Sequence, residues 1–180
     1  DLMQLSIKER ADHIGYVMQN PNQMLCKVQI FDEVALGLVS RGAGEDETRE
    51  HVESALRICG LYPFRKWPVS ALSFGQKKRV TIASILALDP ELIILDEPTA
   101  GQDFRHYTEI MDFLQGLNRR GVTVVMITHD MHLMLEYCRR SVVFSSGRVI
   151  ADASPAQILT DEAIIRQASL KKTSLYDLAL

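Results

Sequence analysis

Short apolar runs alternate along the chain with longer segments in which apolar residues recur every three or four positions. The short runs are typical of strands, and the longer spacing is typical of amphipathic helices. The predicted strands are His13–Gln19, Leu92–Leu95 and Val122–Thr128. Because Leu92–Leu95 contains no polar residue, we expect it to be buried on both faces of a parallel sheet.

The helical spacing occurs in four segments before residue 120. Ser73 and Gln76 form a capping-box pattern at the start of the third helix, and Gly60 is placed to end the second. The apolar positions that define the four helices are Phe31, Val34, Ala35 and Leu38; Val52, Ala55, Leu56 and Cys59; Val80, Ala83, Leu86 and Ala87; and Ile110, Phe113, Leu114 and Leu117.

The last third of the chain predicts a hairpin followed by helices. Two short apolar runs flank Ser146–Gly147, a typical hairpin turn. Ser154 followed by Pro155 predicts a helix start, and Thr160 is a candidate cap for one more helix.

This order of elements predicts an α/β protein with a mostly parallel sheet and an inserted helical subdomain. We expect a catalytic core divided between residues 1–23 and 89–155. The helical subdomain would comprise residues 24–88, and a helical tail residues 156–180.

Composition narrows the class of protein. The chain has 180 residues, 47% hydrophobic and 24% charged, which excludes a disordered chain and a disulfide-rich toxin. A net charge of −3 gives no indication of a nucleic-acid partner. The three cysteines form no C-x-x-C pair, which disfavours zinc and disulfide frameworks. The first residue is not Met, so we expect a piece of a longer protein.

The strongest chemical feature is the pair Asp96-Glu97, which directly follows a hydrophobic strand. Ligands of open α/β sheets bind beyond the carboxyl ends of the strands. One carboxylate there could hold Mg²⁺ together with phosphate oxygens, and the other could deprotonate a water molecule. The alternative is a solvated acid pair, and from these two residues alone both interpretations stand.

Three further features lie at element ends. Ser73, Gly75 and Gln76 begin a helix, whose amino terminus favours anions such as phosphate. His129 follows a predicted buried strand, and Gln19 ends the first one. Taken singly, each has an ordinary structural explanation: a helix cap, a structural histidine and a strand-end amide.

The order of these features gives a resemblance to the nucleotide-binding domain of ABC-type ATPases. Gln19 matches the Q-loop and Leu92–Glu97 the Walker B strand. Leu72–Gln76 matches the signature, with Phe74 in place of a glycine. Thr99–Asp103 matches the D-loop, and His129 the switch histidine.

Further segments resemble the ATPases of energy-coupling factor and cobalt importers. These segments are Gln19–Gln23, Phe31–Gly37 and the tail Ser169–Leu175. The resemblance implies a subunit at the cytoplasmic face of the membrane that hydrolyses ATP with Mg²⁺. It would pair with a second ATPase domain and a transmembrane coupling protein, and would import a vitamin or a transition-metal ion.

The resemblance also implies residue roles. Asp96 would hold magnesium, Glu97 would polarise the attacking water, and His129 would contact the γ-phosphate. Gln19 would touch the magnesium shell and link the site to the membrane partner. Residues that would bind nucleotide held by the opposite subunit, or lie at that interface, are Ser73, Gly75, Gln76 and Asp103.

One expected motif is missing. No G-x-x-x-x-G-K-[ST] loop occurs, and Gly42-Ala43-Gly44 is followed by acids. In the family this phosphate-binding loop precedes the Q-loop, so it would fall before Asp1. We expect a fragment of a working ATPase, inactive alone, rather than a degenerate half, because Asp96, Glu97 and His129 are all present.

Two other functions stay open. A soluble ABC protein acting on DNA or ribosomes would show salt-dependent binding to nucleic acid. A non-catalytic half would lose function on mutation of Ser73 but not of Glu97.

Overall fold

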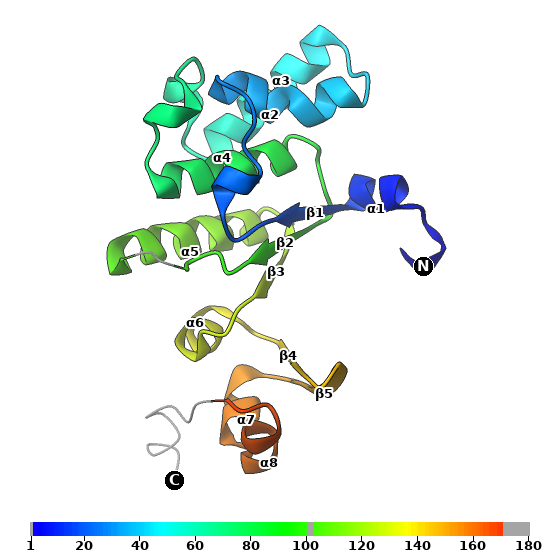
Figure 1. Cartoon of the computed structure of the whole chain (residues 1–180), viewed down its shortest axis with the longest axis vertical. Helices are drawn as coiled ribbons and strands as arrows, with labels where there is room; N and C mark the ends of the chain where they lie inside the picture. The colour runs from blue at the N-terminus through cyan, green and yellow to red at the C-terminus, as the bar shows by residue number, and fades with distance from the viewer. Residues whose placement is uncertain (1, 101–102, 171–180) are drawn as a thin grey trace. The chain divides into compact units, whose positions relative to one another are not determined.

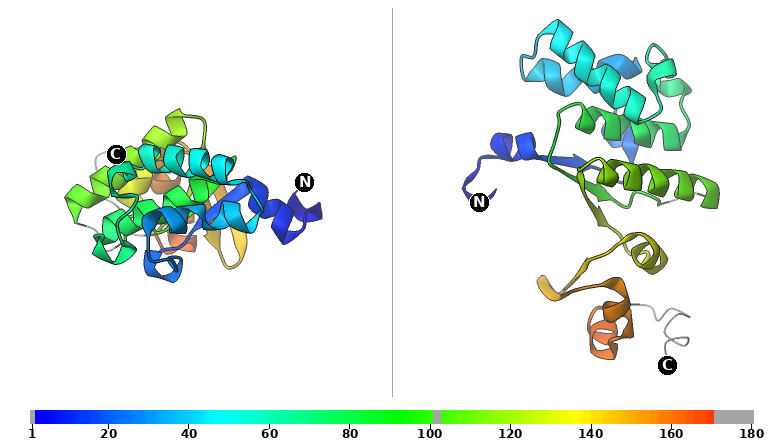
Figure 2. Two further views of the ribbon diagram at one scale, coloured as in Figure 1. Left: turned by 90° about the horizontal axis from the view of Figure 1, so that it is seen from above. Right: turned by 180° about the vertical axis from the view of Figure 1, so that it is seen from behind.

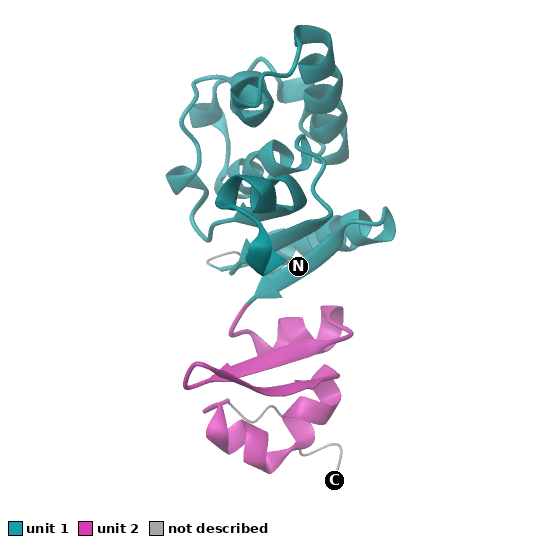
Figure 3. Ribbon diagram, turned by 90° about the vertical axis from the view of Figure 1, so that its right-hand side faces the viewer, with its two compact units in different colours: residues 1–127 teal, residues 128–180 magenta. Residues whose placement is uncertain are grey.

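The computed structural model describes residues 2–100 and 103–170 and divides into two compact units, residues 1–127 and 128–180 (Figure 3). The strands of the first unit are β1 (Ile14–Val17), β2 (Leu92–Asp96) and β3 (Thr123–Ile127). Its helices are α1 (Ile7–His13), α2 (Ile30–Ser40), α3 (Glu45–Ile58), α4 (Phe74–Leu86) and α5 (Phe104–Arg119).

The three strands of the first unit form a parallel sheet in the order β1-β2-β3 (Figure 1). Tyr16 pairs with Ile94, which pairs with Val125 on the other side. The carboxyl ends of all three strands therefore lie at one edge of the sheet. This confirms the predicted α/β class with a parallel sheet.

Helices cover one face of this sheet. α4 packs on β1 and α5 on β3, while α2, α3 and α4 pack together (Figure 2). Ile93 and Leu95 on β2 are fully buried. On the other face Tyr16, Val125 and Ile127 are 44%, 41% and 50% exposed.

The prediction that Leu92–Leu95 is buried on both faces is therefore wrong. Leu92 and Ile94 are only partly buried, because the described helices of the first unit pack against the opposite face. The sequence of β2 could not show which face is covered by helices, because each face carries one leucine and one isoleucine.

The four predicted helices are present, and most of their predicted apolar positions are buried; Phe31, Leu86 and Phe113 are only partly buried. Val34, Ala35 and Leu38 are core residues of α2, and Gly60 follows α3 with φ of 69°. α2, α3 and α4 all lie within residues 24–88; the subdomain boundaries themselves stay a prediction. α1 was not predicted, because none of its residues is buried and it has no apolar stripe.

The described part of the second unit, residues 128–170, contains a hairpin and three short helices. These are α6 (Met131–Tyr137), β4 (Ser141–Ser145), β5 (Arg148–Ala153), α7 (Pro155–Thr160) and α8 (Glu162–Gln167). Ser146 and Gly147 turn between the two antiparallel strands with φ of 48° and 74°, as a two-residue hairpin requires.

One predicted cap in the second unit is wrong. Asp161, not Thr160, caps α8, and its carboxylate accepts hydrogen bonds from the N–H groups of Ala163 and Ile164. The Thr160 hydroxyl donates instead to the carbonyl oxygen of Ala156, within α7. Residues 171–180 of the predicted tail lie outside the described residues. No described helix combines the length and the hydrophobicity needed to cross a membrane.

Close packing of α4 on β1 depends on Gly15. A Cβ atom at Gly15 would overlap Cγ2 of Ile85 on α4. We predict that Gly15→Ala lowers the free energy of unfolding by about 1–3 kcal/mol, the usual cost of overpacking. Urea denaturation of the intact protein would measure it.

Gly116→Ala is the matched control, because nothing lies within 4 Å of a Cβ placed there in α5. It should raise stability by about 0.5–1 kcal/mol, since alanine favours helix. Adding Ile85→Ala should offset part of the Gly15→Ala loss. A Gly15→Ala protein as stable as wild type would contradict the packing argument.

Candidate functional site

Two adjacent carboxylates end the central strand of the sheet. Asp96 is the last residue of β2, and the Glu97 N–H donates to the Ile127 carbonyl oxygen at 2.9 Å. Glu97 has φ of 42°, a left-handed conformation that costs a residue with a side chain about 1 kcal/mol. Such strained residues cluster at functional sites. Both carboxylates are partly buried, at the edge where ligands bind in α/β sheets.

Tyr16 contacts the first of these carboxylates. Its hydroxyl donates to Oδ2 of Asp96 at 2.9 Å, across the β1–β2 pair. This hydrogen bond to a carboxylate raises the pKa of Tyr16, because it favours the neutral phenol. Tyr16 was not among the predicted site residues, because the pairing of β1 with β2 that brings it to Asp96 has no local sequence pattern.

A buried lysine lies between the ends of β1 and β2. Lys78 of α4 is 1% exposed, and its ammonium donates to the carbonyl oxygens of Met18 at 2.9 Å and Gln19 at 2.8 Å. Burial lowers the pKa of Lys78 to about 8, while the charges of Asp96 and Glu97 oppose this shift. Lys78 therefore contacts the backbone at Gln19 and lies close enough to the carboxylate pair for their charges to act on it.

Lys78 was not among the predicted site residues. Its position offered a signal. Lys78, Ile82 and Ile85 lie four and three residues apart on one stripe of α4, and Ile82 is fully buried. A lysine within an apolar stripe is rarely buried without partners, so it indicates a specific contact.

The predicted signature residues form a second part of the site. Ser73 caps α4: its hydroxyl accepts from the Gln76 N–H at 3.3 Å, and Gln76 Oε1 accepts from the Ser73 N–H at 3.0 Å. A cavity of about 390 Å³ opens beside this helix start. It is lined by Ser73, Gly75, Gln76, Arg79, Arg105, His106, Glu109 and Ile110.

The same cavity is joined to Asp103 through His106. Asp103 caps α5, and its carboxylate accepts from the backbone N–H of His106 at 3.0 Å and pairs with Nδ1 at 2.8 Å. These hydrogen bonds lower the pKa of Asp103. The structure thus brings Ser73, Gly75 and Gln76 to one cavity and ties Asp103 to its wall. Residues 101–102 of the predicted D-loop lie outside the described residues.

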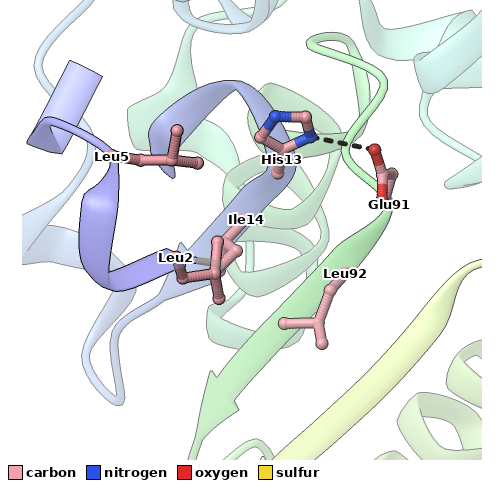
Figure 4. Close-up of a pocket in the computed structure, with 6 residues that line it drawn as sticks. All are labelled: Leu2, Leu5, His13, Ile14, Glu91 and Leu92. Carbon is pink, nitrogen blue, oxygen red and sulfur yellow. Dashed lines mark hydrogen bonds and ion pairs between the residues drawn. The ribbon is translucent and has the colours of Figure 1, made fainter. Parts of the chain in front are cut away.

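A different cavity, of about 350 Å³, lies at the amino ends of β1 and β2 (Figure 4). Leu2, Leu5, Ile14 and Leu92 line it, with one polar pair between His13 Nδ1 and Glu91 at 2.9 Å. Because ligands bind at the opposite edge of such sheets, and because the lining is largely apolar, this cavity is not suited to a nucleotide.

Comparisons with known proteins agree with this geometry. The family model described as "ABC transporter" matches residues 1–100. The chain belongs to the ABC transporter family. A second model, "AAA domain, putative AbiEii toxin, Type IV TA system", matches residues 65–136.

Two relatives are similar over nearly the whole chain. A "Putative ABC transporter ATP-binding protein" of Enterococcus faecalis is 68% identical over 99% of this chain. One from Clostridium perfringens is 67% identical over 97%. The chain covers 32% and 31% of these relatives, so it spans about a third of their length.

A solved structure confirms the ABC ATPase fold. CbiO1 from Clostridium perfringens, described as part of the ABC transporter complex cbiONQ, matches with a TM-score of 0.80 and 36% identity. The match covers 96% of this chain and 69% of CbiO1.

The residues at the end of β2 fit a magnesium ion of the kind that accompanies ATP. Asp96 offers carboxylate oxygens, the ligands Mg²⁺ prefers, and no group of three or more acidic, His or Cys side chains surrounds it within the described residues. Phosphates and water would complete the shell, as is usual for Mg²⁺. His129 lies in the second unit, so its predicted proximity to Glu97 stays a prediction.

The capping role of Ser73 can be tested separately from ligand binding. We predict that Ser73→Ala lowers the free energy of unfolding by about 1 kcal/mol, because the Gln76 N–H loses its acceptor. Ser73→Thr, which keeps a hydroxyl, should stay near wild type. Ser70→Ala, at an exposed position, is the control. Chemical denaturation would measure all three, and equal stability of Ser73→Ala and wild type would contradict the cap.

Proposed function

We propose that this chain is part of the ATP-hydrolysing subunit of an energy-coupling factor type ABC importer for a vitamin or a transition-metal ion. The observation that carries the proposal is the Asp96-Glu97 pair, placed at the carboxyl end of a parallel strand with the Lys78 charge nearby. The likeness to CbiO1, a part of an ABC transporter complex, supports the importer class.

Each acidic residue has a distinct role in this proposal. Asp96 would hold magnesium, which would supply positive charge against that of the phosphates. Glu97 accepts hydrogen bonds from the attacking water and orients it. Gln19 touches the magnesium shell, and His129 contacts the γ-phosphate.

The second part of the site serves a neighbouring molecule. Ser73, Gly75 and Gln76 offer the amino end of α4 to the γ-phosphate of nucleotide held by a second ATPase domain. Asp103 lies at the same interface. ATP would hold two domains together, and hydrolysis would release them. Arg79 and Arg105 line the cavity beside Ser73, and Glu109 pairs with both, at 3.7 Å and 3.2 Å.

The membrane partner would dock on the loop between β1 and α2. Gln23 and the residues Cys26–Val28 are exposed, whereas Val34, Ala35 and Leu38 are buried in the core. We propose that the segment Gln23–Val28 contacts a transmembrane coupling protein at the cytoplasmic face of the membrane.

Removing the catalytic carboxylate tests the proposal. We predict that Glu97→Gln in the full-length protein lowers the rate of Mg²⁺-dependent ATP hydrolysis by about 10²- to 10⁴-fold, because the amide cannot accept the proton of water. ATP binding should persist. Phosphate release would measure the rate, with Glu50→Gln on the exposed surface of α3 as the control. A Glu97→Gln protein as active as that control would refute the catalytic role.

The missing phosphate-binding loop gives a second test. We predict that the polypeptide of residues 1–180 alone does not hydrolyse ATP, because it lacks the G-x-x-x-x-G-K-[ST] loop that binds the β- and γ-phosphates. Turnover by this polypeptide above that of its own Glu97→Gln version would show that the loop is dispensable.

A further inference from the structure

Charged side chains hold the loop between β1 and α2, and an antiparallel bridge between Gln29 and Pro68 adds backbone pairing at its far end. After β1 ends at Val17, only one short 3₁₀ turn, Pro21–Gln23, forms before α2 begins at Ile30. Gln19 lies near one end of this loop, and the exposed residues Cys26–Val28 lie near the other. The loop therefore contains both the residue proposed to touch the magnesium shell and the segment proposed to dock on the membrane partner.

Lys78 fixes the first end of the loop. Its ammonium donates to two consecutive backbone carbonyls, those of Met18 and Gln19, at 2.9 Å and 2.8 Å. A buried ammonium is costly unless it is hydrogen-bonded, so these contacts resist displacement. Next to it on α4, Lys77 donates to Oδ1 of Asn22 at 3.1 Å.

Glu33 fixes the second end. This carboxylate of α2 is 4% exposed, and its Oε2 accepts the backbone N–H groups of Cys26 at 2.8 Å and Lys27 at 2.6 Å. Charge-assisted hydrogen bonds of this length are among the stronger ones in proteins. Two buried charges from different helices, one positive and one negative, thus hold opposite ends of one loop.

We infer that Lys78 is a positioning residue for ATP hydrolysis, which acts by fixing the backbone at Gln19, while Glu33 independently fixes the docking end of the same loop. Because Lys78 belongs to α4, a shift of α4 must move the carbonyls of Met18 and Gln19 with it. The geometry at Gln19 therefore follows the helix that carries Ser73. This inference rests on the proposed function, since Gln19 has a role only if ATP is hydrolysed.

The test uses the full-length protein with Lys78→Met, which keeps the length and apolar stem of the side chain but removes its donors. We expect kcat for MgATP to fall about 10- to 100-fold, the effect of a displaced group, with KM changing less than threefold. Lys78→Arg, which restores donors, should recover part of the rate. Lys66→Met, at an exposed lysine, is the matched control and should match wild type.

A double-mutant cycle shows whether Lys78 acts through Gln19. If it does, Gln19→Ala together with Lys78→Met should be no more than about threefold slower than the slower single variant. If the loss of kcat in the double variant equals the product of the two single losses, the inference is overturned. An unchanged kcat in folded Lys78→Met would overturn it as well. Glu33→Gln should keep basal kcat within about threefold of wild type. A loss as large as that of Lys78→Met would overturn the inference that Glu33 holds only the docking end of the loop.

Hydrogen exchange separates this inference from the proposed function. Lys78→Met should speed amide exchange in residues 18–22, and Glu33→Gln in residues 26–28, whether or not the protein hydrolyses ATP. If wild-type protein shows no ATP hydrolysis that depends on Glu97, the proposed function fails. Amide exchange then still tests whether Lys78 and Glu33 hold the two ends of the loop. Should Lys78→Met not fold, Lys78→Gln takes its place, and unchanged exchange at residues 18–22 in either variant overturns the inference.

Discussion

The parallel pairing of β1 with β2 is the constraint on which the site depends. The register that aligns Tyr16 with Ile94 places the end of β1 beside Asp96, so that one hydroxyl reaches across to the carboxylate. Parallel strands require a long connection between them, and here that connection contains the whole helical segment from α2 to α4. The residues that contact each other at the sheet edge are therefore about sixty to eighty positions apart in sequence.

Close approach of α4 to this sheet makes the lysine contact possible. Gly15 leaves room for Ile85, and Lys78 lies two turns earlier on the same helix, level with the end of β1. A buried charged residue is a poor source of net stability, because desolvation offsets most of its attraction. Its value here is geometric, since few other side chains could donate to two adjacent carbonyls from inside a helical layer.

Much of the fold followed from local pattern, and the failures have physical reasons. Helices with an apolar stripe, the capping box at Ser73, the helix cap at Ser154 and the hairpin at Gly147 are encoded within a few residues and were predicted. The exposure of Ile127, at the end of β3, depends on which face of the sheet the helices cover. The residues next to it in sequence do not indicate this. α1 has no apolar stripe that would predict it. The predicted cap of α8 was wrong by one residue, because Thr160 and Asp161 can both cap a helix.

The sequence identified site residues whose type and position are informative by themselves. It did not identify residues whose role depends on contacts made in the folded chain. Asp96 and Glu97 stand out as adjacent acids directly after a hydrophobic run, whereas Lys78 and Tyr16 can be recognised only from their partners in the fold.

The capping box at Ser73 also shows that a structural and a functional explanation need not compete. The box satisfies the N–H groups of Ser73 and Gln76, but a helix leaves its first four N–H groups without intrahelical partners. The N–H groups of Phe74 and Gly75 belong to this set and face the amino end of α4. An anion can therefore bind there without breaking the cap, and the cap holds the helix start in the conformation that presents those donors. The same serine can stabilise the fold in every state and, in the function proposed above, contribute to nucleotide binding when a second domain is present.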